Sequence, residues 1–174
     1  MVLLSGARQV GKTTLAKAIA GEKATYVTLD DSQALQTAQA DPQQFLCHNR
    51  ELMIIDEIQK LPQLISAIKI AVDANNRRGQ FILTGSADIL SLPTTRESLA
   101  GRAGFVQLKP MSQGEIEGKK PRFLHYLRAR EFPFLQSNSG RMEIITRAFR
   151  GGYPEAIQMP PHARRIWHED YVRA

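Results

Sequence analysis

A glycine-rich segment near the N-terminus is the feature that most constrains what this chain can fold into. Residues 6–13 read Gly-Ala-Arg-Gln-Val-Gly-Lys-Thr and fit the pattern G-x-x-x-x-G-K-[ST]. Glycines let such a loop wrap closely around a phosphate, and backbone N–H groups then face the anion at the start of the following helix. Lys12 would bring positive charge to the β- and γ-phosphates, and the Thr13 hydroxyl is a hard oxygen ligand suited to Mg²⁺. The segment predicts a nucleotide site rather than an ordinary strand–turn–helix with a coincidental Lys-Thr pair.

The rest of the first half alternates short apolar runs with amphipathic stretches. The apolar runs predict strands at 2–4, 25–29, 52–55, 81–84 and 105–108, and the amphipathic stretches predict helices at 12–20, 42–47 and 62–75. The unbroken apolar run at 52–55 is typical of a central parallel strand buried on both faces. We therefore predict an α/β fold, a P-loop NTPase three-layer sandwich around a central parallel sheet of about five strands.

Beyond Pro110 the strand signals fade and helical periodicity takes over. Helices are expected at 112–118, 121–130, 138–150 and 160–173, with a turn at 151–154. We expect a P-loop core over residues 1–109 and a helical C-terminal subdomain over residues 110–174.

Composition narrows the class of protein. The chain has 174 residues, of which 43% are hydrophobic and 23% charged, so it has the profile of an ordinary globular domain and not of a disordered chain. No apolar run approaches the roughly 20 residues that span a bilayer, and the N-terminus lacks a basic leader. Its one cysteine, Cys47, has no partner for an internal disulfide. We expect a soluble protein of the cytoplasm that does not enter a membrane.

The net charge of +6 is unevenly distributed. Residues 1–90 hold nine Lys/Arg and nine Asp/Glu, whereas residues 91–174 hold fourteen and eight. A basic half can indicate nucleic-acid contact. Here, however, basic residues alternate with glutamates at helical spacing, which is typical of a solvated helix face. Both interpretations remain open on the sequence.

An acidic pair, Asp56-Glu57, follows the apolar strand at 52–55. Ligands of parallel sheets bind at the carboxyl ends of the strands, where this pair would emerge. Asp56 would hold Mg²⁺ through its water shell, and Glu57 would orient and deprotonate the water that attacks the γ-phosphate. The next strand ends in Thr84-Gly85-Ser86, where a hydroxyl could contact the γ-phosphate. We favour Ser86, because Thr84 would still face the sheet.

The glycine-rich loop, the acidic pair and the Thr-Gly-Ser turn, together with three further segments, resemble the AAA+ ATPases of a prokaryotic branch. The matching segments lie at 6–14, 54–59, 83–86, 97–102, 108–112 and 151–156. The resemblance implies an ATPase core followed by a C-terminal domain of unknown function. It assigns the following residues to the nucleotide-binding Walker A loop: Gly6, Ala7, Arg8, Gln9, Val10, Gly11, Lys12, Thr13 and Thr14. Asp56 and Glu57 take the Walker B positions, and Ser86 takes the sensor position.

The resemblance also makes Arg102, in Ser-Leu-Ala-Gly-Arg, a candidate for an arginine that reaches a γ-phosphate in its own site or a neighbour's. A surface arginine in a salt bridge is the structural alternative. Family members usually carry a segment before the first strand and continue past the last predicted helix. On that comparison this chain looks like a truncated ATPase core with an incomplete helical subdomain.

The resulting functional hypothesis is Mg²⁺-dependent hydrolysis of ATP to ADP and phosphate, coupled to a conformational change. A nucleotide-gated switch with little turnover is the main alternative. A small-molecule P-loop kinase and a DNA-associated ATPase are further alternatives, the last resting on the basic second half alone. Self-association stays open, because only an arginine acting in trans would require it.

Overall fold

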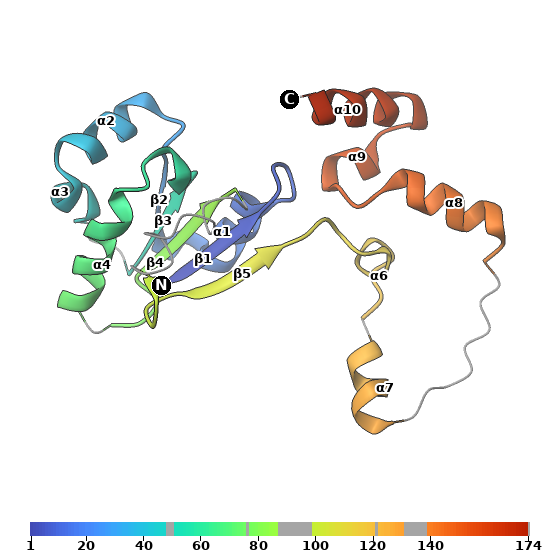
Figure 1. Cartoon of the computed structure of the whole chain (residues 1–174), viewed down its shortest axis with the longest axis horizontal. Helices are drawn as coiled ribbons and strands as arrows, with labels where there is room; N and C mark the ends of the chain where they lie inside the picture. The colour runs from blue at the N-terminus through green and yellow to red at the C-terminus, as the bar shows by residue number, and fades with distance from the viewer. Residues whose placement is uncertain (48–50, 76, 87–98, 121, 131–138, 174) are drawn as a thin grey trace. The chain divides into compact units, whose positions relative to one another are not determined.

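The centre of the fold is a sheet of five parallel strands. It is seen in a computed structural model that describes residues 1–47, 51–75, 77–86, 99–120, 122–130 and 139–173 (Figure 1). The strands are β1 (Val2–Gly6), β2 (Ala24–Thr28), β3 (Leu52–Asp56), β4 (Phe81–Gly85) and β5 (Gly104–Leu108). Their order across the sheet is β2-β3-β4-β1-β5, and every neighbouring pair is parallel. The predicted α/β fold with a five-stranded parallel sheet is confirmed.

Helices cover the two faces of this sheet. They are α1 (Lys12–Ala20), α2 (Ser32–Ala40), α3 (Pro42–Leu46) and α4 (Leu64–Ala74), with short 3₁₀ turns at Gly21–Lys23 and Ile58–Lys60. One face of the sheet packs with α2, α3 and α4, drawn together on the left of Figure 1, in a cluster that includes Leu3, Ile55 and Leu83. The opposite face packs with α1 through Leu4 and Ile54. Successive residues of β1 and β3 thus feed different clusters, as alternation along a strand requires.

Helix α2 was not predicted from the sequence. Its residues are mostly Ala and Gln, and only Ala38 is fully buried, so the helical stripe is faint. The helix is fixed at its start by Asp31, whose carboxylate accepts a hydrogen bond from the Gln33 N–H at 2.8 Å. The same device opens α3, where Asp41 accepts from the Gln44 N–H at 2.9 Å.

A second compact unit, Pro110–Ala174, follows the first, Met1–Lys109. Its helices are α6 (Gln113–Ile116), α7 (Phe123–Ala129), α8 (Arg141–Arg150), α9 (Pro154–Gln158) and α10 (Pro161–Arg173). Helix α9 was not predicted, because Pro154 was taken as part of a turn; it is instead the first residue of the helix. The predicted first residues 121 and 138 of two helices lie outside the described residues.

Aromatic side chains hold part of this second unit together. Tyr153, which precedes α9, lies 5.2 Å from Trp167 and 4.9 Å from Tyr171 between ring centroids, and both partners are on α10. The Met111 N–H also bonds the Gly152 carbonyl at 2.7 Å. Within the described residues, no helix is both long enough and apolar enough to cross a membrane.

Candidate functional site

The glycine-rich loop connects the end of β1 to the start of α1. A Cβ at Gly6 would collide with the carbonyl of Leu108 on the neighbouring strand, so only glycine fits there. Gly11 has a φ of 95°, in the left-handed region that favours glycine. It precedes α1 without a side-chain cap, and the first turn of that helix has no acidic residue. These features leave an uncapped, positive helix terminus at the end of the loop.

The Lys12 side chain folds back onto the backbone of the loop. Its Nζ donates to the carbonyls of Gly6 at 3.1 Å and Ala7 at 2.8 Å, and the residue is only 6% exposed. Burial lowers the pKa of the Lys12 ammonium below its usual value, and the carboxylates of Glu57 and Asp56 oppose that shift. The cation is thus held next to the loop backbone, at the place where the motif predicts phosphates.

The other loop residues differ in their surroundings. Val10 is buried at 4% exposure beneath the loop. Gln9 has a φ of 60°, an uncommon value outside glycine. Arg8 and Thr14 are exposed. Val10 thus anchors the loop to the core, whereas the side chains of Arg8 and Thr14 are open to solvent.

Asp56, at the end of β3, is the best-connected side chain of the site. Its carboxylate accepts hydrogen bonds from Thr13 Oγ1 at 2.7 Å, from Tyr26 OH at 2.9 Å and from Thr84 Oγ1. Asp56 is 5% exposed. Side chains from α1, β2 and β4 therefore meet at one carboxylate at the end of β3.

Tyr26 is a member of the site that the sequence did not single out. Burial and the hydrogen bond to Asp56 raise the pKa of its hydroxyl to about 12. The Lys17 ammonium lies 3.6 Å from the centre of its ring. A tyrosine in a strand is ordinarily a packing residue, and the contact of Tyr26 with Asp56 depends on the pairing of β2 with β3, which the sequence alone does not give.

The residues present fit a magnesium ion that is shared with phosphates. Thr13 and Asp56 supply a hydroxyl and a carboxylate oxygen 2.7 Å apart, and both are hard donors. No group of three or more His, Cys, Asp or Glu side chains among the described residues could hold a metal. Mg²⁺ commonly binds through one or two protein ligands and the phosphates of its substrate, so the pair is sufficient.

Glu57 adopts an unusual backbone conformation beside Asp56. Its φ of 58° lies in the left-handed region, which costs energy for a residue other than glycine. Its N–H donates to Thr84 Oγ1 at 3.3 Å, and its carboxylate accepts from Gln59 Nε2. Gln59 Oε1 in turn accepts from the Ser86 N–H at 3.2 Å.

The end of β4 contributes differently from what the sequence suggested. Thr84 is fully buried in the sheet, yet its hydroxyl contacts both Asp56 and the Glu57 N–H. Ser86 lies at the same edge and joins the network through its backbone N–H. Thr84 therefore belongs to the site as well, although the sequence argument set it aside.

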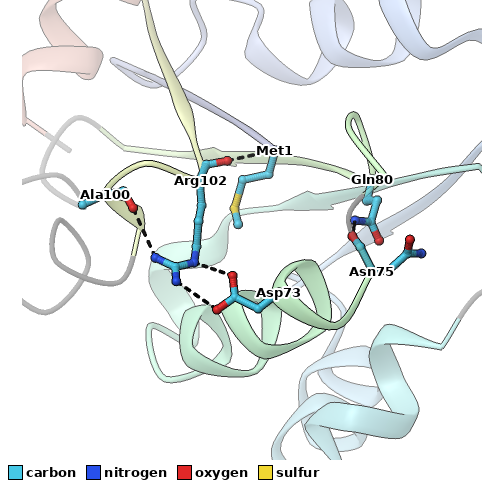
Figure 2. A network of polar contacts seen from close by, with 6 residues as sticks. All are labelled: Met1, Asp73, Asn75, Gln80, Ala100 and Arg102. Carbon is cyan, nitrogen blue, oxygen red and sulfur yellow. Dashed lines mark hydrogen bonds and ion pairs between the residues drawn. The ribbon is translucent and has the colours of Figure 1, made fainter.

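Arg102 is not brought to the phosphate loop within the chain. It precedes β5, and its backbone carbonyl accepts from the Met1 ammonium at 3.1 Å, at the amino end of β1 (Figure 2). The loop follows the opposite end of β1, five residues along a strand that rises about 3.3 Å per residue. The guanidinium grips Asp73 at 2.6 and 2.9 Å, and this hydrogen-bonded pairing lowers the pKa of the Asp73 carboxyl. In the structure, Arg102 is therefore a surface arginine in a salt bridge, which was the alternative to a role at a phosphate.

The parallel sheet, the loop that leads into α1 and the carboxylate cluster at the same edge define an α/β P-loop protein. A family model described as an AAA domain matches residues 1–117. The chain belongs to this family of AAA-type P-loop ATPases.

Two uncharacterized relatives also match this chain. Uncharacterized proteins of Mycobacterium tuberculosis and Mycobacterium bovis are each 35% identical over 117 residues, covering 67% of this chain and 26% of the relative. The chain thus spans about a quarter of the length of these relatives. The match to the family model runs through α6 and ends eight residues beyond the first structural unit.

Proposed function

We propose that this chain binds Mg²⁺-ATP and hydrolyses it to ADP and phosphate, coupled to a conformational change. The observation that carries the proposal is the contact of Thr13 with Asp56 at the foot of the Lys12 loop, with Glu57 as the next residue. Membership of the AAA family supports nucleotide binding in general. The adjoining carboxylate favours hydrolysis over transfer, because it equips the site to activate water.

Each residue then has a separate task. Loop N–H groups and Lys12 would hold the β- and γ-phosphates, and Thr13 and Asp56 would hold Mg²⁺, which neutralises phosphate charge when bound. The Lys12 ammonium has three N–H donors and gives two of them to the carbonyls of Gly6 and Ala7, so binding of the γ-phosphate would use the third donor or replace one of these bonds. Glu57 would accept a proton from the attacking water, and Ser86 would contact the γ-phosphate or that water.

Arg102 can contribute to phosphate chemistry only from a second copy of the chain. Its position at the amino end of the sheet separates it from its own loop. For such a role, the Arg102 guanidinium would have to leave Asp73 and bind the phosphate of a neighbouring copy. The chain would then have to self-associate. We retain this role as part of the proposal, together with ATP as the nucleotide and the cytoplasm as the location.

The experiment that tests the proposal measures ATP binding and product formation in parallel. Wild type should bind ATP more tightly with Mg²⁺ than with EDTA and should release ADP and phosphate. Lys12→Ala should lose binding, whereas Glu57→Gln should keep binding and lose turnover. Binding without turnover in wild type would favour the nucleotide-gated switch. Phosphate that appears on an added small molecule instead of in solution would favour a kinase.

A further inference from the structure

Gln59 lies between the two strand ends that carry the proposed catalytic groups. It belongs to the 3₁₀ turn Ile58–Lys60, directly after β3. Its Nε2 donates to the Glu57 carboxylate, and its Oε1 accepts from the Ser86 N–H at 3.2 Å. One side chain therefore links Glu57 on the β3 side to Ser86 on the β4 side.

The chemistry of the two partners suits an amide in this link. A carboxylate only accepts hydrogen bonds, and a backbone N–H only donates them. The group between them must donate on one side and accept on the other, which fixes the orientation of the Gln59 amide. Lysine could satisfy Glu57 alone, and glutamate could satisfy Ser86 alone.

The backbone around Glu57 makes the link consequential. Its N–H is already tied to Thr84 Oγ1 at 3.3 Å, and its φ of 58° directs the chain sharply away from β3. The backbone is thus fixed, but a glutamate side chain keeps several rotatable bonds. The Gln59 bond is the contact among the described residues that restrains the carboxylate itself. A general base must be held in place to act on one water.

We propose that Gln59 is a positioning residue that holds the Glu57 carboxylate at a fixed place relative to Ser86 at the end of β4. Gln59 thereby couples Ser86, which would contact the γ-phosphate, to Glu57, which would activate water. The inference rests on the proposed hydrolysis and adds a residue that the motifs do not assign.

The first test measures the link without requiring turnover. Amide hydrogen exchange at Ser86, followed by NMR, should be at least about tenfold faster in Gln59→Met than in wild type, because the acceptor is lost. Gln59→Glu keeps that acceptor and should retain the protection. Equal exchange at Ser86 in wild type and Gln59→Met would overturn the link.

The second test measures its consequence for catalysis. Gln59→Met and Gln59→Glu should each lower kcat about tenfold while KM for ATP stays within about twofold, because both lose the donor to Glu57. Gln63→Met is the matched control: Gln63 is exposed, makes no capping hydrogen bond at the start of α4, and its substitution should leave kcat unchanged.

The outcomes separate this inference from the proposed function. A wild-type kcat in either Gln59 variant, or a kcat above wild type, would overturn the positioning role alone. Absence of turnover in wild type would overturn the proposed hydrolysis and the positioning role with it. A lower kcat in a Gln59 variant that is also partly unfolded at the assay temperature would count against positioning, because misfolding would explain the loss of kcat.

Discussion

Asp56 is a nearly buried carboxylate that accepts hydrogen bonds from hydroxyl groups on α1, β2 and β4. An ionised carboxylate is costly to bury unless such donors or a cation compensate. The hydroxyls of Thr13, Tyr26 and Thr84 provide such donors. Each of them should therefore influence both stability and metal binding at this site.

Thr84→Val tests the most deeply buried of these hydroxyls. Valine has nearly the same shape, but Asp56 would lose a donor and the Glu57 N–H would lose its acceptor. We expect the free energy of unfolding to fall by about 1–3 kcal/mol, measured by urea denaturation. Thr37→Val on exposed α2 is the control and should change it by less than about 0.5 kcal/mol. Equal effects of the two substitutions would contradict the account of Asp56.

Tyr26 gives the site a dependence on pH. Its pKa is raised from 10.0 to about 12, so the neutral hydroxyl is favoured in the folded chain. Its stabilising contribution is fully present below pH 10 and is lost as the pH rises through about 12. Stability should fall less steeply over this window in Tyr26→Phe than in wild type.

Absorbance at the tyrosinate band checks this directly. Tyr153, whose hydrogen bond with Tyr171 raises its pKa to about 12, serves as an internal reference in the other unit. Tyr26→Phe should remove one of the two groups that titrate near pH 12. Loss of a group that titrates near pH 10 instead would show that the Tyr26 hydroxyl does not bond Asp56.

The sequence predicted only part of this site, for a physical reason. Lys12, Thr13, Asp56 and Glu57 belong to short motifs whose spacing follows from the chemistry of phosphate and Mg²⁺. Tyr26, Thr84 and Gln59 enter through side chains whose partners depend on the register of β2, β3 and β4. That register is a property of the folded sheet, and no local pattern encodes it.

At the scale of elements, strands were easier to predict than helices. Strands buried on both faces, such as β3, carry continuous apolar runs that mark them in the sequence. Helix α2 has one fully buried residue, and α9 spans five residues, so neither has a strong helical pattern. Their starts are set by Asp31 and Pro154, signals that are also common in turns.

Gly6→Ala tests the junction of β1, β5 and the loop. The added methyl group would meet the Leu108 carbonyl, which cannot move without breaking the β1–β5 pairing. We expect a loss of about 1–3 kcal/mol in unfolding free energy together with weaker ATP binding. Gly104→Ala, at the other end of β5, has open space around it and should change neither quantity. Tolerance of Gly6→Ala would contradict the close approach of the two strands.

At the scale of the whole molecule, the basic second half is partly neutralised by its own acidic residues. Arg147 pairs with Glu143 at 2.6 Å and with Glu117 at 3.1 Å, and Lys119 also pairs with Glu117 at 2.6 Å. These pairs favour a solvated face over a nucleic-acid interface. We expect the fluorescence anisotropy of labelled duplex DNA to stay unchanged on addition of the chain at both about 50 mM and about 200 mM salt. Binding that weakens steeply from 50 to 200 mM salt would favour the DNA-associated alternative.

Phosphate release from Mg²⁺-ATP by the whole chain is the measurement that tests the central claim most directly. The rate should be measured at saturating ATP for wild type, Lys12→Ala and Glu57→Gln, at several protein concentrations. The account predicts release by wild type that both substitutions abolish. Release that persists in Glu57→Gln, or no release from wild type that binds Mg²⁺-ATP, would contradict it.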